Sequence, residues 1–66
     1  MNRELLLEQT VEQLELMNHA LGVLRRECLP AEARKFAILA EGPLEEIRRL
    51  QIEIEHLSAE LATEKS

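Results

Sequence analysis

The stretch LEEIRRLQIEIEHLSAEL, residues 44–61, decides the fold of this chain. Apolar side chains recur in it at alternating steps of three and four residues, which is the a/d pattern of a heptad. They are Ile47, Leu50, Ile54, Leu57 and Leu61, with Leu44 beside them. The positions between them are mostly Glu, Arg, Gln and His. A helix with such a stripe needs partner helices to cover it.

The length of 66 residues predicts a single domain spanning 1–66. A chain this short buries only about 60% of its unfolded surface, so it normally relies on disulfides, a metal or oligomerisation. Cys28 is the only cysteine, which excludes a disulfide within the chain. Cys28, His19 and His56 are too few to form a structural zinc site. Oligomerisation is the remaining source of stability.

Composition predicts an all-α protein, because Ala, Leu, Glu, Arg and Gln dominate and these residues favour helices. The net charge of −5 argues against a broad nucleic-acid or anionic-membrane surface. No signal peptide is visible, and no stretch approaches the roughly 20 apolar residues of a membrane span. We therefore expect a cytoplasmic protein that has no membrane association and needs no cofactor.

The first helix is expected to run from about residue 2 to about 27, with Asn2 as its N-cap and Arg25 and Arg26 at its end. One broad apolar face of this helix comprises Leu7, Val11, Leu14, Met17, Leu21, Leu24 and Cys28. A second apolar strip comprises Leu5, Leu16, Ala20 and Val23. A helix that is apolar over more than half its circumference is covered from more than one side, which predicts self-association.

Two breaks follow, at Leu29-Pro30 and at Gly42-Pro43. They divide the rest of the chain into helices of about 31–41 and about 43–63. In one architecture the chain turns only at Pro30 and is merely kinked at Pro43, which gives an antiparallel helical hairpin. In the other, both breaks are true turns. We favour the hairpin, because the apolar stripe keeps nearly one heptad frame across Pro43.

Two such hairpins would form a homodimeric four-helix bundle, and a larger homo-oligomeric helical bundle or coiled coil is also open. The residues expected at the oligomer interface are Leu7, Val11, Leu14, Leu16, Met17, Leu21, Val23, Leu24, Phe36, Ile47, Leu50, Ile54, Leu57 and Leu61. The expected partner is the chain itself, with another protein as an alternative.

The pair Glu53 and His56 matches the Glu-x-x-His spacing of di-iron four-helix proteins, so it is the candidate metal site. Both residues are expected to point away from the apolar stripe, which favours an ordinary surface network instead. In that network Arg49 would pair with Glu45 and Glu53, and His56 would pair with Glu60. No hydroxyl group has a matched base, and no glycine-rich phosphate loop exists, so we expect no enzymatic activity.

Four basic residues flank the Pro30 turn and would gather at one tip of a hairpin: Arg25, Arg26, Arg34 and Lys35. The simpler interpretation is that they provide solubility and complement the helix dipole. The functional one is that they bind an acidic partner or nucleic-acid phosphates. Because no stacking aromatic residue adjoins them, the sequence argues against single-stranded nucleic acid as the ligand.

Residues 29–47, LPAEARKFAILAEGPLEEI, resemble the first half of the C-terminal DNA-binding region of sigma factors. The matching points are Leu29-Pro30, Arg34, Gly42 and Glu46-Ile47, which together span under a third of the chain. The resemblance implies a helix–turn–helix. The chain departs from it after Ile47, where the acidic stretch 51–61 replaces the basic recognition helix. We interpret the resemblance as a shared helix–glycine–helix pattern only.

The sequence as a whole predicts a non-enzymatic helical interaction module, acting as a scaffold, adaptor or small regulator. The alternatives are a nucleic-acid-associated regulator that uses the basic turn and a small carboxylate/histidine metal-binding bundle.

Overall fold

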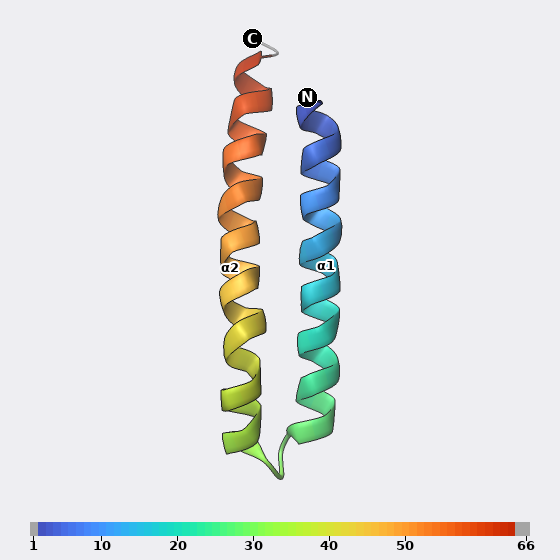
Figure 1. Ribbon diagram of the computed structural model, residues 1–66, viewed down its shortest axis with the longest axis vertical. Helices are drawn as coiled ribbons and strands as arrows, with labels where there is room; N and C mark the ends of the chain where they lie inside the picture. The colour runs from blue at the N-terminus through green and yellow to red at the C-terminus, as the bar shows by residue number, and fades with distance from the viewer. Residues whose placement is uncertain (1, 65–66) are drawn as a thin grey trace.

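The computed structural model of the protein describes residues 2–64, which form two antiparallel helices lying side by side. Helix α1 spans Arg3–Cys28 and helix α2 spans Ala33–Glu64 (Figure 1). Residues 29–32 make the tight turn at one end, and the two termini of the chain lie at the other. The predicted all-α helical hairpin is therefore confirmed.

Asn2 caps α1 as its sequence position indicates. Its Oδ1 atom accepts hydrogen bonds from the backbone N–H groups of Glu4 at 2.9 Å and Leu5 at 3.2 Å. These bonds satisfy two of the donors that the first turn of a helix leaves unpaired. At the other end, the N–H of Leu29 donates to the carbonyl oxygen of Arg25 at 2.8 Å. The cap therefore fixes where α1 begins, at the open end of the hairpin.

The second break expected from the sequence does not form, because α2 continues through Gly42 and Pro43 as one helix. The three-segment alternative, with helices of 31–41 and 43–63, is therefore wrong. Two features allow the helix to pass the proline. Gly42 has no Cβ atom to meet the proline ring, so the usual clash with the preceding residue is reduced. Gly42 also has no positive φ, so it does not end the helix in the left-handed conformation.

The core is a single seam between the two helices. From α2, the predicted stripe lies in it as expected, with Ala40, Ile47, Leu50 and Leu57 buried and Ile54 and Leu61 half-buried. From α1, the buried residues are Thr10 and Cys28. Cys28 belongs to the predicted apolar face of α1, and Thr10 lies five turns before it on the same side of the helix. The other members of the predicted face are half-buried, so the predicted face is the packed one: Leu7, Val11, Leu14, Met17, Leu21 and Leu24.

The hairpin is a rod rather than a globule. It measures 51 × 16 × 14 Å, and its radius of gyration is 15.3 Å. A compact domain of the same length would have a radius of gyration of about 11 Å. The solvent-accessible surface is 5230 Å², whereas a compact monomer of this mass exposes about 4,300 Å². One layer of contacts between two helices therefore leaves roughly 900 Å² more surface in water than a compact fold would.

Candidate functional site

The most prominent surface feature is exposed aliphatic side chains. Leu16 is 66% exposed and Ile38 is 64% exposed. The other large apolar residues that are about half exposed are Leu5, Leu39, Leu44 and Ile52. They are spread over both helices and over more than one side of the rod.

Most of the residues predicted at the oligomer interface are covered within the hairpin. Ile47, Leu50 and Leu57 are buried. Ten more are half-buried: Leu7, Val11, Leu14, Met17, Leu21, Val23, Leu24, Phe36, Ile54 and Leu61. Leu16 is exposed, so it offers the most surface of this set to another molecule.

The two edges of α2 beside the seam differ in charge. With Ile47 and Ile54 at heptad position a, position g holds Glu46, Glu53 and Glu60. The opposite edge, at position e, holds Ala37, Leu44, Gln51 and Ser58, none of which is charged. The g edge of α2 is therefore acidic and its e edge is not. The grooves beside the e edge are nevertheless lined by charged residues, namely Glu41, Glu45 and Arg48 of α2 and Glu8, Glu12 and Glu15 of α1.

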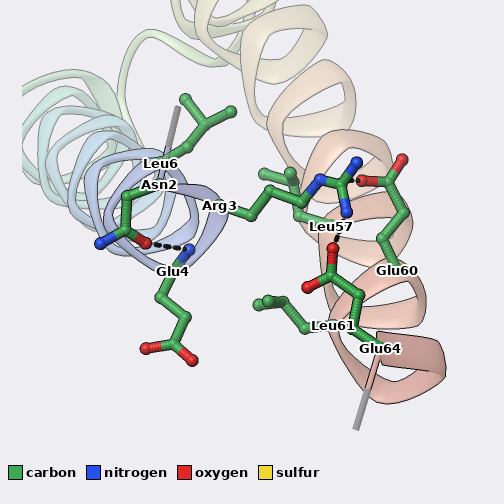
Figure 2. Close-up of a pocket in the computed structure, with 8 residues that line it drawn as sticks. All are labelled: Asn2, Arg3, Glu4, Leu6, Leu57, Glu60, Leu61 and Glu64. Carbon is green, nitrogen blue, oxygen red and sulfur yellow. Dashed lines mark hydrogen bonds and ion pairs between the residues drawn. The ribbon is translucent and has the colours of Figure 1, made fainter.

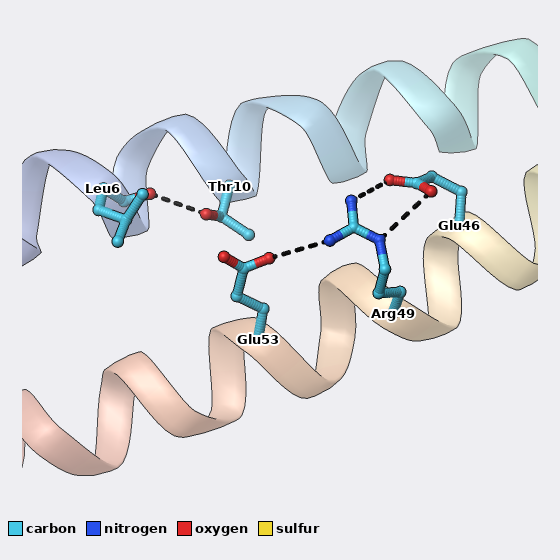
Figure 3. A network of polar contacts seen from close by, with 5 residues as sticks. All are labelled: Leu6, Thr10, Glu46, Arg49 and Glu53. Atoms are coloured by element: carbon cyan, nitrogen blue, oxygen red, sulfur yellow. Dashed lines mark hydrogen bonds and ion pairs between the residues drawn. The ribbon is translucent and has the colours of Figure 1, made fainter.

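Arg49 organises the acidic edge (Figure 3). Its guanidinium group binds Glu46 and lies 3.4 Å from Glu53 Oε2, so the expected pairing with Glu53 is present. The expected partner Glu45 is replaced by Glu46. The hydrogen bond from Arg49 lowers the pKa of the Glu46 carboxyl group and raises the pKa of Arg49. Both residues are in contact with water, so this network adds little stability.

A shallow cleft lies at the open end of the hairpin (Figure 2). Leu6, Leu57 and Leu61 form its apolar floor. Arg3 reaches across from α1, with its Nε atom 3.3 Å from Glu60 Oε2 and a second contact to Glu64. The sequence suggested that Glu60 would pair with His56. In the structure Glu60 pairs with Arg3 instead. Arg3 is thus paired with two carboxylates at this cleft, and the carboxylate of Glu4, which also lines it, points away from Arg3 (Figure 2).

The candidate metal pair is not assembled into a site in the described part of the chain. His56 is exposed as predicted, but Glu53 is half-buried at the edge of the seam and paired with Arg49, contrary to expectation. Glu53 lies closer to the seam because position g adjoins it. Among residues 2–64, no three His, Cys, Asp or Glu side chains gather closely enough to hold a metal ion.

The basic turn is present at the closed end of the rod. Arg25 and Arg26 lie in the last turn of α1, where the helix dipole favours cations. Arg34 and Lys35 lie in the first turn of α2, which contains no acidic residue. All four side chains are exposed, and Lys35 lies 3.8 Å from Glu32. The turn therefore carries a small excess of positive charge on an acidic rod.

Thr10 is the residue at the seam that the sequence interpretation missed. It is only 5% exposed, and its hydroxyl group donates to the carbonyl oxygen of Leu6 at 2.8 Å. Thr10, Met17 and Leu24 recur every seven residues, so this row does carry a signal. Met17 and Leu24 were placed on the predicted face, and Thr10 was left out of it because its side chain is polar.

Comparisons with known protein families, with curated proteins and with solved structures find no match to this chain. The local resemblance of residues 29–47 to sigma factors is therefore not supported by a family match, and its helix–turn–helix is replaced by the continuous helix α2. Neither helix of residues 2–64 has a stretch apolar enough to cross a bilayer.

Proposed function

We propose that this protein is a non-enzymatic helical interaction module that associates with further copies of itself. The observation that carries the proposal is the surplus surface of the rod. The roughly 900 Å² by which it exceeds a compact monomer is close to the area, about 800 Å², that each partner buries in a standard protein interface.

The composition of that surface supports the same conclusion. Five apolar residues of the described chain are buried, which is a small core for a domain of this size. At least six large aliphatic residues are about half exposed or more. Covering them in a second hairpin would build the four-helix arrangement in which such helices commonly occur.

The test is the solution mass of the intact chain across a dilution series, measured by light scattering. We expect a mass of at least twice 7.6 kDa at high micromolar concentration. We also expect helix content to fall as dilution produces the lone hairpin. A fully helical 7.6 kDa species at every concentration would overturn the proposal.

A second candidate function is favoured by the basic turn. Arg34 and Lys35 occupy the first turn of α2, where the helix dipole opposes cations. Their placement there costs stability, and recognition of an acidic partner or of nucleic-acid phosphates would explain it. A gel shift with duplex DNA tests the nucleic-acid form of this candidate. Salt-sensitive binding that is lost in Arg34→Gln/Lys35→Gln would support it, and no binding at low salt would contradict it.

A further inference from the structure

We propose that two copies of the chain associate side by side and antiparallel, so that the basic turn of each copy lies beside the acidic open end of the other. The inference rests on the proposed self-association and adds the orientation of the second copy. The observation that carries it is the uneven distribution of charge along the rod.

The closed end of the rod is positive. Residues 24–40 hold two glutamates and the four basic residues of the turn, which gives a net charge of +2. Of these four, only Lys35 has an ion-pair partner within residues 2–64, which is Glu32. The other three are exposed arginines that can bind carboxylates of another molecule: Arg25, Arg26 and Arg34.

The open end of the rod is negative. Residues 2–9 and 55–64 lie beside one another there (Figure 1) and hold five glutamates and Arg3, a net charge of −4. Arg3 is paired with two of the five. Counting Lys65, which follows in the sequence, an excess of three negative charges remains. The other three carboxylates are exposed and have no ion-pair partner in the described part of the chain: those of Glu4, Glu8 and Glu55.

The two ends decide between the two orientations. The middle of the rod, residues 10–23 and 41–54, holds six glutamates and two arginines and faces the middle of the other copy in either orientation. A parallel pair places like charges together at both ends, whereas an antiparallel pair places +2 beside −4 at both ends. Touching rods lie within about one Debye length, roughly 8 Å at physiological ionic strength, so salt does not remove this difference.

The shape of the rod favours pairing along its length over stacking of turn on open end. An end of the rod measures 16 × 14 Å, roughly 220 Å², which is far below the area of about 800 Å² that each partner buries in a standard interface. A long side of 51 × 16 Å, roughly 800 Å², matches that area. The exposed aliphatic residues are also spread along the rod, with Leu5 near the open end, Leu16 in the middle and Ile38 near the turn.

The first experiment exchanges charges between the two ends at constant net charge. Arg34 and Glu55 are both exposed at heptad position b of α2, near opposite ends of the rod. Arg34→Glu/Glu55→Arg brings the closed end to zero and the open end to −2. It also places an acid in the first turn of α2, which the helix dipole favours, so the hairpin itself is not weakened. We expect the dimer Kd to rise about three- to tenfold, measured by sedimentation equilibrium.

The matched control makes the same exchange in the middle of the rod. Glu41 and Arg48 are exposed at the same heptad position, and Glu41→Arg/Arg48→Glu leaves the charge of every segment unchanged. We expect its Kd to stay within about twofold of wild type. An unchanged or lowered Kd in the end-exchange variant, or an equal rise in both variants, would overturn the antiparallel orientation.

The second experiment measures the orientation directly. Ala31→Cys in a Cys28→Ala background provides one exposed thiol in the turn for a nitroxide label, so any measured distance joins two copies. An antiparallel pair places the two turns at opposite ends of a rod 51 Å long, which predicts a label separation of about 40 Å or more by pulsed electron resonance. A separation of about 25 Å or less would show a parallel pair and contradict the proposal. An end-to-end pair would also give a long separation, but it would nearly double the maximum dimension.

The outcomes separate this inference from the proposed function. If wild type is dimeric and the turns lie together, the orientation is wrong and self-association stands. If wild type is monomeric at every concentration, the proposed function fails, and the antiparallel pairing fails with it.

Discussion

Thr10 is a polar residue buried at the seam whose hydrogen bond does not cross from one helix to the other. Its hydroxyl group is bonded to the Leu6 carbonyl oxygen, which lies one turn back on the same helix, and not to α2. Thr10→Val removes a buried hydroxyl group and keeps the shape. The Leu6 carbonyl remains available to its ordinary helix partner, so no acceptor is left unsatisfied.

We therefore expect Thr10→Val to hold the free energy of unfolding or to raise it by up to about 1 kcal/mol. Thr63→Val is the matched control, because Thr63 makes the same bond to Ala59 at an exposed position, at 2.9 Å. Urea unfolding followed by circular dichroism at one protein concentration measures both. A loss of more than about 1 kcal/mol in Thr10→Val alone would mean that the hydroxyl group stabilises the seam.

Leu50 supplies the opposite case, because it is an apolar side chain that is only 2% exposed at the centre of the seam. Leu50→Ala removes buried contacts and leaves a cavity, so it should lower the free energy of unfolding by about 2–5 kcal/mol. Leu16→Ala, at a site that α2 does not cover, should change it by less than about 0.5 kcal/mol. Equal losses in the two variants, measured by the same urea titration, would contradict the single-seam core.

How well the role of a single residue could be predicted depends on how far apart in the sequence the interacting residues are. The cap at Asn2 is local, because its side chain bonds to backbone groups two and three residues away, and the sequence was sufficient to predict it. Thr10 was missed because it is polar, although Met17 and Leu24, which follow it at seven-residue steps, were placed on the packed face. The Arg3 pairs join residues about sixty positions apart, and no sequence pattern within either helix indicates them.

Within α2, the Arg49 network gives a test at the scale of one helix. The hydrogen bond from Arg49 lowers the pKa of Glu46, so the pair stabilises the fold above the ordinary pKa of a glutamate. That contribution is lost as the pH falls through the lowered pKa. Arg49→Gln should therefore shift the pKa of Glu46 upward, measured by NMR titration of its carboxyl carbon. Arg48→Gln should leave it in place, and an equal shift in both variants would show a general charge effect instead.

Gly42 and Pro43 give the second test at this scale, because α2 passes through a proline that should interrupt it. Pro43→Ala restores a backbone N–H donor and removes the ring, so it should raise the free energy of unfolding by up to about 3 kcal/mol. Gly42→Ala alone should raise the free energy of unfolding little, since its new Cβ atom meets the proline ring. In the Pro43→Ala background, Gly42→Ala should raise the free energy of unfolding by about 1 kcal/mol more.

Gly22→Ala is the matched control for this cycle, because Gly22 lies inside α1 with no proline after it. An added Cβ atom there would lie 4.0 Å from Arg26 Nη1, which is an ordinary contact. We expect Gly22→Ala alone to raise the free energy of unfolding by about 1 kcal/mol. If Gly42→Ala gained as much as Gly22→Ala in the wild-type background, the glycine would not be what lets the helix pass Pro43.

The same pair explains why the helix boundaries were partly mispredicted. Glycine followed by proline is the usual sign of a helix end, and both residues are individually poor in a helix interior. The heptad frame, which continues from Phe36 and Ala40 into Ile47, indicated a continuous helix instead. The structure follows the frame, because ending the helix at Gly42 would remove that stripe from α1, at a cost larger than one missing backbone hydrogen bond.

At the scale of the whole molecule, the fold could be predicted because it needs only two periodic segments and one turn. The interaction surface could not be placed from the sequence alone. This surface consists of the apolar residues that are not packed between the two helices. Which residues these are depends on how each helix is rotated about its own axis. Leu16 and Val23 were predicted at the interface on equal terms, yet the structure leaves Leu16 66% exposed and Val23 half-buried.

The rod shape makes the mode of association measurable. Docking through a long face places two rods side by side, so the mass doubles while the longest dimension stays close to 51 Å. Docking through the termini or the basic turn would place them end to end and nearly double that length. Small-angle X-ray scattering on the dimer distinguishes the two, and the Arg34→Gln/Lys35→Gln variant is the control for contacts at the turn. A maximum dimension near twice that of the single hairpin would contradict docking along a long face, whatever the mass.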